Sequence, residues 1–557
     1  MDIRKISDTF FVAPQITEAD LPGLREQGIQ SIICNRPDGE GADQPAFTEL
    51  AQTAQKLGLD MRYVPVTAGM VRDKDAVDFA SALDALRKPV LAYCRTGTRS
   101  ATLWSLAQAK TQPLADILSA TKSAGYDMKG VVRRIANGGK TPVDQADASY
   151  DVVVIGGGAS GIAVAAGLLS RQSGMEIAVI DPADAHYYQP GWTMVGGGIF
   201  EAEDTVRTMG SLIPKGVHWL KSAVAAFEPE KDAVILDGCR VVKYKRLVVC
   251  PGLKLDWGRV EGLVDTLGRN GVTSNYRYDL APYTWELVSG MNSGRAVFTQ
   301  PPMPIKCAGA PQKAIYLSAD HWTRQNTISE IDIQFHNAGG VLFGVKDYVP
   351  ALQHYVDKYR IGLNFFHNLV AVDGPAKKAW FDVAVPDQTP KRIEVEFDMI
   401  HVTPPQTAPD FIAVSPLADA AGWVDVDQAT LRHKTFDNIW SLGDVMNAPN
   451  AKTAAAARKQ APVVADNIVA DINGHAPTSQ YDGYGSCPLT VERGKIVLAE
   501  FGYGGTLQPS FPKWLIDGTK PSRLAWLLKE RILPPVYWKA MLKGHEWMAA
   551  PEKITVR

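Results

Sequence analysis

The chain has 557 residues, of which 46% are apolar and 21% are charged, and its formal net charge is −2. This length exceeds what one hydrophobic core can organise, so we expect two to four domains. The balanced charge gives no sign of a nucleic-acid-binding surface. The sequence has no run of about 18 apolar residues that would predict a spanning helix, and its N-terminus lacks the apolar segment of a secretory signal.

The cysteines are six in number and scattered: Cys34, Cys94, Cys239, Cys250, Cys307 and Cys487. No two of them form a C-x-x-C pair, so we predict no metal site. Scattered cysteines without a signal peptide fit a reducing compartment. We expect Cys239, in a turn, and Cys250, at the end of an apolar strand, to be ordinary structural thiols.

The first 138 residues alternate strand-like and helical runs, which predicts an α/β domain with a mostly parallel sheet. We expect strands at 10–13, 31–34, 61–66 and 90–93, and helices at 46–57 and 73–86. The small, polar residues that follow have no periodicity. They predict a linker, which we place at 139–149.

This domain contains a loop with a cysteine between a predicted strand and a predicted helix. The strand at 90–93 runs into Cys94-Arg95-Thr96-Gly97-Thr98-Arg99-Ser100, and a helical run from 101 to 109 follows. The helix N-terminus and the charges of Arg95 and Arg99 would stabilise a thiolate at Cys94. Cysteine phosphatases place their arginine six positions after the cysteine, where this chain has Ser100. With Arg99 five positions on, the loop resembles that of rhodanese-type sulfurtransferases, whose cysteine carries a persulfide.

The whole domain resembles a small phosphatase-fold family with sulfurtransferase-like loops, often found beside sulfur-oxidising enzymes. The segment Asn35-Arg36-Pro37-Asp38-Gly39-Glu40 also matches that family, and Arg36 or Asp38 could face the active loop. The alternative is a degenerate phosphatase domain that serves only for docking.

A dinucleotide-binding turn opens the second part of the chain. An apolar strand at 150–155 leads into G-x-G-x-x-G at Gly156, Gly158 and Gly161, followed by a helical run at 162–169. These glycines permit the tight turn, the approach of the pyrophosphate and close helix packing. Ser160 lies in the same turn. A second strand, at 177–180, ends at Asp181, where a carboxylate would hold a ribose hydroxyl.

A later strand, 438–442, ends at Gly443 and Asp444, and a helix is expected to start at Lys452 and Thr453. Asp444 could bind a ribityl chain, and the helix dipole could stabilise a reduced flavin. A plain strand-to-helix turn is the alternative. Together with the upstream fingerprint, this segment favours FAD over NAD.

The second glycine loop of a two-nucleotide flavoenzyme is missing. The strand at 295–299 runs instead into a turn that contains Cys307. This replacement indicates a flavin that receives electrons through sulfur, because the turn that would bind the pyrophosphate of NADH is absent. Lys306 and Lys313 could lower the pKa of the Cys307 thiol.

From residue 150 to about 548 the chain resembles the sulfide:quinone oxidoreductases of the mitochondrial-like type. The motifs that carry the resemblance are Tyr187–Trp192, Ile305–Lys313, His401–Pro405, Ala420–Val426 and Tyr481–Pro488. The resemblance implies a tandem Rossmann-type, FAD-dependent flavoprotein of the disulfide-reductase superfamily, with Gln189 and Pro190 beside the cofactor. It also implies that Cys307 and Cys487 form the redox centre. Sulfide attacks the bridge between them, a persulfide forms on one cysteine, and the thiolate of the other passes two electrons to FAD and then to quinone.

Residues 511–557 concentrate Trp, Leu, Pro and Lys. We expect Pro534-Pro535 to separate two short amphipathic helices whose exposed Trp and Leu insert at a membrane surface. The expected location is therefore peripheral, at the cytoplasmic face of a membrane. The alternative is a helix pair that caps the protein's own core or a dimer partner.

The sequence thus predicts a sulfurtransferase domain (1–138), a linker (139–149), a sulfide:quinone oxidoreductase domain (150–510) and a membrane- or quinone-binding region (511–557). The expected partners are sulfide, quinone, a membrane surface and a small sulfane-sulfur acceptor such as glutathione or sulfite. Cys94 is a further candidate acceptor, and a homodimer is possible. The alternative functions are an NADH:quinone oxidoreductase and a flavoprotein with a non-catalytic docking domain.

Overall fold

The computed structural model describes residues 2–41, 44–69, 71–142, 146–237 and 240–554. The chain divides into two compact units. Unit 1 contains Met1–Ser149, Ser222–Tyr244 and Asp410–Ala418, and unit 2 contains Tyr150–Lys221, Lys245–Pro409 and Asp419–Arg557. Part of the expected linker (143–145) and Cys239 lie outside the described residues.

Unit 1 is built on a five-stranded sheet in the order β1-β2-β5-β3-β4. Its strands are β1 (Arg4–Ser7), β2 (Phe10–Ala13), β3 (Ser31–Cys34), β4 (Asp60–Tyr63) and β5 (Val90–Tyr93). Its helices are α1 (Leu21–Glu26), α2 (Phe47–Lys56), α3 (Asp73–Ala85), α4 (Thr98–Gln108), α5 (Leu114–Ser123) and α6 (Val132–Ala136). Only the β1–β2 pairing in this described sheet is antiparallel, so the predicted mostly parallel sheet is confirmed.

Each face of this sheet has its own core. In β5, Val90 and Ala92 join one cluster, whereas Leu91 and Tyr93 join the other, as the two-residue period of a buried strand requires. The first cluster also includes apolar side chains from later parts of the chain, in β11 (Val224–Glu228) and β12 (Ala233–Leu236). The helix α13 (Asp410–Ala413) belongs to unit 1 as well.

Unit 2 contains the two Rossmann-type sheets that the sequence predicts. The first holds β6 (Ala148–Ile155), β7 (Ile177–Ile180), β10 (Val217–Leu220), β13 (Val241–Val249) and β24 (Ile439–Ser441). The second has the order β15 (Val272–Thr273), β22 (Met399–His401), β16 (Gly294–Gln300), β17 (Ile331–Asn337) and β18 (Gly362–Phe365), all parallel.

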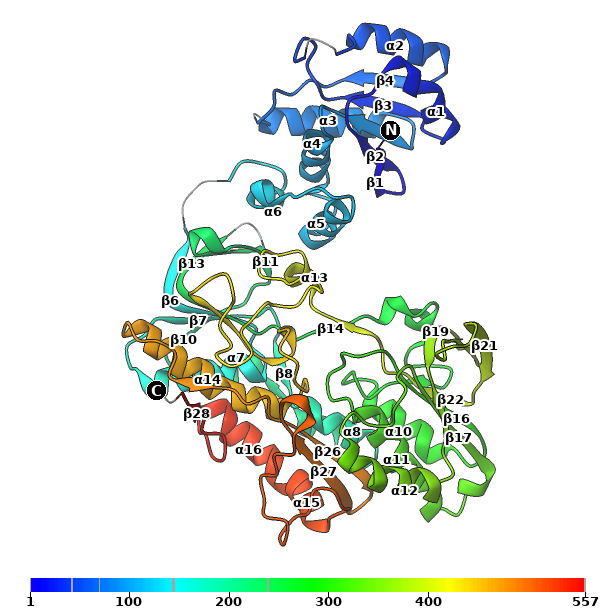
Figure 1. Ribbon diagram of the computed structural model, residues 1–557, viewed down its shortest axis with the longest axis vertical. Coiled ribbons are helices and arrows are strands. Elements are labelled where there is room, and N and C mark those ends of the chain that lie inside the picture. The colour runs from blue at the N-terminus through cyan, green and yellow to red at the C-terminus, as the bar shows by residue number, and fades with distance from the viewer. Residues whose placement is uncertain (1, 42–43, 70, 143–145, 238–239, 555–557) are drawn as a thin grey trace. The chain divides into compact units, whose positions relative to one another are not determined.

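The main helices of unit 2 follow the expected strand–helix alternation. They are α7 (Ala159–Arg171), α10 (Ala281–Gly290), α11 (Ala310–Arg324), α12 (Val349–Lys358) and α14 (Ala454–Ile472), with the short α8 (Trp192–Val195) and α9 (Leu263–Thr266). Figure 1 shows α10, α11 and α12 gathered near β16 and β17, and the hairpin of β26 (Gly485–Glu492) and β27 (Lys495–Phe501) next to α11.

Smaller strands complete unit 2. They are β8 (Ala185–Tyr187) with β9 (Val206–Thr208), β14 (Lys254–Leu255) with β23 (Gln406–Thr407), β25 (Ser479–Gln480) with β28 (Glu552–Lys553), and the antiparallel group β19 (His367–Asp373), β20 (Lys378–Val383) and β21 (Lys391–Glu396).

The C-terminal segment differs from the predicted pair of separated helices. A π-helical turn at Leu528–Ile532 joins α15 (Arg523–Leu527) directly to α16 (Leu533–Lys539). The two prolines occupy the first turn of α16, where a missing N–H costs no helical hydrogen bond.

The expected exposure of the tail's apolar residues holds for Leu524 and Leu527 but is wrong for Trp526, which is 8% exposed and packs beside Leu498. Among the described residues, no helix is long and apolar enough to cross a membrane.

Candidate active site

The dinucleotide turn has the geometry that its glycines predict. Gly156 follows β6 with a φ of +101°, which favours glycine. A Cβ on Gly161 would lie 1.8 Å from the Gly156 carbonyl oxygen, whereas a Cβ on Gly158 would meet nothing within 4 Å among the described residues. The turn is therefore closely packed at Gly161 and open at Gly158, where a pyrophosphate could approach. Asp181, at the end of β7, accepts the Gly157 N–H at 2.6 Å.

The segment after β24 lies against this turn. Gly443 has a φ of +79°, and a Cβ there would lie 2.6 Å from Ser160 Oγ. Thr453 is the N-cap of α14 and accepts the Ala456 N–H at 3.1 Å, so the predicted helix start is confirmed. Lys452 Nζ donates to the backbone oxygen of Asp444 at 2.7 Å.

Of the two charged side chains in this segment, Lys452 is buried and Asp444 is half-buried. Burial lowers the pKa of Lys452 to about 8. Burial also raises the pKa of the Asp444 carboxyl, against the opposing effect of Lys452 and Lys306.

The structure brings Cys307 and Cys487 together, although they come from different elements. Cys307 lies in the turn before α11 with a φ of +50°, in the left-handed region. Cys487 lies in β26 and is 2% exposed. Their Sγ atoms are 3.5 Å apart, so the pair is a reduced dithiol close enough to form a disulfide with a small movement. The Cys307 N–H donates to the Lys452 oxygen at 2.8 Å, which connects the pair to the start of α14.

Lys313 has the predicted effect on Cys307. Its Nζ donates to Cys307 Sγ at 3.0 Å. The hydrogen bond with Cys487 and the charge of Lys313 hold the pKa of Cys307 well below its usual range. The same hydrogen bond and burial raise the pKa of Cys487. The pair therefore loses its first proton readily, from Cys307, and its second with difficulty.

Lys306 has a different arrangement from the predicted one. Its Nζ donates to Gln189 Oε1 at 2.5 Å and lies 5.8 Å from the centre of the Trp192 ring. Lys306 therefore connects the Cys307 turn to the Gln189-Pro190 segment.

Lys529 is a site residue that the sequence interpretation missed. It lies in the π-helical turn, is 4% exposed, and donates to the Pro190 oxygen at 3.3 Å. Burial and the charge of Lys313 lower its pKa to about 7, against the opposing effect of Cys307 and Cys487. Lys529 thus adds a second buried amine to the cysteine pair. Its only signal in the sequence is its place among the basic residues of the tail.

The N-terminal cysteine loop is a separate site within unit 1. Cys94 is 1% exposed at the end of β5, and the Gly97 N–H donates to its Sγ at 3.2 Å. The helix α4 begins at Thr98, earlier than predicted. The side chain of Arg95 is exposed.

Arg99 is held by neighbours outside the loop. It donates to the oxygens of Asn35 at 3.1 Å and Val66 at 2.6 Å, and its Nη2 lies 2.8 Å from Glu40 Oε1. Arg36 pairs with the other oxygen of Glu40 at 2.9 Å. Arg36 is therefore connected to Arg99 of the loop through Glu40. Asp38 instead accepts the Phe47 N–H, outside the loop.

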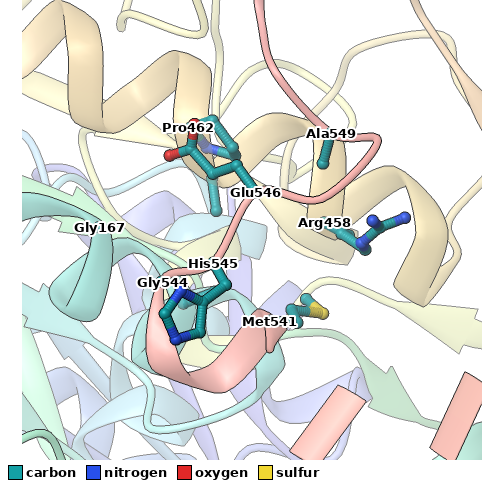
Figure 2. A pocket seen from close by; sticks show the side chains of 10 residues that line it. Gly167, Arg458, Pro462, Met541, Gly544, His545, Glu546 and Ala549 are labelled. Carbon is teal, nitrogen blue, oxygen red and sulfur yellow. The ribbon is translucent and has the colours of Figure 1, made fainter. Parts of the chain in front are cut away.

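Unit 2 also has a small pocket whose lining includes none of the predicted site residues. Figure 2 shows it, lined by residues that include Gly167, Arg458, Pro462, Met541, His545 and Glu546. Glu546 pairs with Arg171 at 2.6 Å. Because the lining contains no cysteine and none of the predicted site residues, we assign it no redox role.

Comparison with known proteins agrees with this geometry. A mitochondrial sulfide:quinone oxidoreductase of Dictyostelium discoideum is 41% identical over 396 residues, which cover 71% of this chain and 86% of that protein. The chain belongs to the sulfide:quinone oxidoreductase family. The solved structure of the family's enzyme from Aquifex aeolicus covers 71% of the chain and 92% of its own, with 19% identity and a TM-score of 0.59, and supports the fold.

The N-terminal part has separate relatives. Residues 2–111 match the family model of the phosphatase-like domain of the beta-lactamase hydrolase-like protein. The beta-lactamase hydrolase-like protein of Agrobacterium fabrum is 34% identical over 135 residues, which cover 24% of this chain and 31% of that protein. The phosphatase-like fold predicted for this domain is therefore confirmed.

FAD is the cofactor of this chain, and the residues present fit it. The open space at Gly158 suits a pyrophosphate. The long helix α14 directs the positive end of its dipole toward the segment that holds Asp444 and Lys452.

Proposed function

We propose that the chain oxidises sulfide at the Cys307–Cys487 pair and passes the two electrons through FAD to a quinone. The observation that carries this proposal is the pair itself: two sulfur atoms 3.5 Å apart, with Lys313 Nζ 3.0 Å from Cys307. The names of the relatives, as sulfide:quinone oxidoreductases, supply the electron donor and acceptor.

The cycle starts from the disulfide form of the pair. A hydrosulfide ion attacks Cys487 Sγ, the bond between the two cysteines breaks, and its electron pair leaves on Cys307. Cys487 then carries a persulfide and Cys307 a thiolate. We assign the thiolate to Cys307 because Lys313 stabilises a negative charge there.

FAD supplies a two-electron acceptor that can be reoxidised by a quinone. The chain's own residues position the cysteine pair and would bind the FAD. The backbone hydrogen bond from Cys307 to Lys452 fixes the turn that contains Cys307. The cofactor would be held by two groups of residues from the dinucleotide turn and the segments near it: Gly156, Gly158, Ser160, Gly161 and Asp181, and Gly443, Asp444, Thr453, Gln189 and Pro190. Lys529 would add positive charge that stabilises the Cys307 thiolate.

The sulfur leaves to a small acceptor, such as glutathione or sulfite, or to Cys94, and the thiolates of Cys307 and Cys487 then re-form their disulfide as the two electrons pass on to the flavin. Two observations support Cys94 as an acceptor. Its sulfur accepts a loop N–H at the start of α4, and Arg95 and Arg99 belong to the same loop. Tethering would raise the effective concentration of Cys94 wherever the linker permits contact. The alternative, a domain used only for docking, predicts that Cys94→Ser leaves thiosulfate:cyanide transfer unchanged.

We also propose that the C-terminal region lies at the cytoplasmic face of a membrane, close to a lipid-soluble quinone. Leu524, Leu527 and Ile532 are exposed in the same stretch as Arg523 and Arg531, a composition that favours the headgroup region. Co-sedimentation with anionic lipid vesicles should fall when the three apolar residues are replaced by serine. Unchanged sedimentation would contradict this placement.

Sulfide-dependent reduction of a soluble quinone tests the main proposal. The rate should vanish in Cys307→Ser and in Cys487→Ser, while Cys34→Ser, a buried thiol of unit 1, should retain it. Full activity in either of the first two variants would overturn the mechanism. Rapid quinone reduction by NADH would instead favour the NADH:quinone oxidoreductase alternative.

A further inference from the structure

Tyr126 places an unpaired hydroxyl group at the Cys94 loop. The residue follows α5, is 5% exposed, and its hydroxyl has no hydrogen-bond partner among the described residues. An unpaired buried hydroxyl is costly, because it has given up its hydrogen bonds to water. Such a group in a site with a nucleophile indicates that a ligand supplies the partner.

The hydroxyl is directed at the loop itself. A Cβ on Gly97 would lie 2.1 Å from the Tyr126 oxygen, so the hydroxyl is in close contact with the residue whose N–H donates to Cys94 Sγ. Only a glycine can therefore occupy this position, and its φ of +88° independently favours one.

The ring of Tyr126 is fixed in this position. The Arg4 guanidinium lies 5.2 Å from the ring centre, and the Tyr126 N–H donates to Thr121 at the end of α5. Burial raises the pKa of Tyr126, so the hydroxyl remains protonated and can donate.

Tyr126 and Cys94 share Gly97 as a neighbour without a hydrogen bond to each other. Because both groups contact Gly97, an atom attached to the sulfur is a candidate partner for the hydroxyl. In a persulfide the second sulfur extends about 2 Å beyond the first. We propose that Tyr126 donates a hydrogen bond to the outer sulfur atom of a persulfide on Cys94 and so makes this loop a sulfane-sulfur site.

This inference rests on the proposed sulfur transfer at Cys94 and names its substrate class, a small sulfane-sulfur donor. With thiosulfate as donor, the Cys94 thiolate attacks the outer sulfur, the sulfur–sulfur bond breaks, and its electron pair leaves with sulfite. The outer sulfur, now bonded to Cys94, carries the negative charge that Tyr126 would stabilise. Cyanide then removes this sulfur as thiocyanate and the thiolate is restored, so no external oxidant or reductant is needed.

The test measures thiosulfate:cyanide transfer by the full-length holoenzyme. Tyr126→Phe keeps the ring and its contact with Arg4 but removes the donor. It should lower kcat about ten- to hundredfold, the range for losing a hydrogen bond to a charged group, with little change in KM for thiosulfate. Tyr93→Phe is the matched control, because that buried tyrosine directs its hydroxyl toward Cys34.

A pH profile separates a hydrogen-bond role from a purely structural one. The alkylation rate of the Cys94 persulfide, followed by peptide mass spectrometry, should have its midpoint at higher pH in Tyr126→Phe, because the anionic sulfur has lost a donor. An unshifted midpoint, or equal losses of kcat in Tyr126→Phe and Tyr93→Phe, would overturn the inference.

Cys94→Ser distinguishes this inference from the function on which it rests. Wild-type transfer in Tyr126→Phe, together with none in Cys94→Ser, would overturn the role of Tyr126 and leave sulfur transfer at Cys94 standing. Transfer that persists in Cys94→Ser would overturn both.

Discussion

Lys529→Met should stabilise the protein and impair its reaction at the same time. The wild-type amine is 4% exposed, and its pKa is lowered from 10.5 to about 7. At about pH 7 this difference corresponds to about 4 kcal/mol of lost stability, at 1.36 kcal/mol per unit. Methionine has a similar length and no charge, so the substitution should recover much of that energy.

The stability gained by Lys529→Met should become smaller as the pH rises. Because the pKa of Lys529 is lower in the folded chain, the unfolded chain binds more protons between about pH 7 and 10.5. The free energy of unfolding of the wild type therefore rises with pH across that window, and the advantage of Lys529→Met should shrink to about 1 kcal/mol near pH 9.5. Urea unfolding of both proteins, followed by flavin fluorescence, measures both values.

The same substitution should slow sulfide-dependent flavin reduction about tenfold or more, since it removes a charge beside the cysteine pair. Lys539→Met, in the same segment, is the control. A variant that is less stable than the wild type near pH 7, or one that reacts at the wild-type rate, would refute the reasoning.

Three further substitutions test other parts of the site. Gly161→Ala places a Cβ 1.8 Å from the Gly156 oxygen, so the purified protein should lack FAD, and normal flavin absorbance would contradict this. Gly309→Ala places a Cβ 2.6 Å from Cys487 Sγ and should slow flavin reduction by sulfide at least about tenfold with FAD retained, whereas Gly344→Ala, which has open space, should not. Lys313→Met should raise the pKa of Cys307, so the pH midpoint for alkylation of the reduced pair should move upward. A midpoint that stays in place would show that Lys313 does not stabilise the thiolate.

Local patterns were sufficient to predict much of the fold. The predicted strands 10–13, 31–34, 90–93 and 177–180 match β2, β3, β5 and β7 residue for residue, because each is a short, mostly apolar run ended by a proline, a polar residue or a cysteine. The fingerprint turn followed from the glycine spacing together with the flanking strand, the helix and Asp181. The pairing of Cys307 with Cys487 came from family resemblance, since no local pattern relates the two.

The residues that were missed act across long separations in sequence. Lys529 reaches the cysteine pair only through the π-helical turn of the tail, and its basic neighbours suggested a surface role. Glu40 connects Arg36 and Arg99 through a loop without periodicity. Tyr126 follows a helix as an ordinary aromatic residue, and its unpaired hydroxyl is visible only once the Gly97 contact is known.

Anaerobic titration of the flavin with sulfide tests the central claim most directly. In the wild type, sulfide should bleach the flavin absorbance in proportion to the amount added. In Cys307→Ser and Cys487→Ser the FAD should remain bound and oxidised at the same sulfide concentrations. Bleaching of either serine variant at the wild-type rate would show that electrons reach FAD without the cysteine pair.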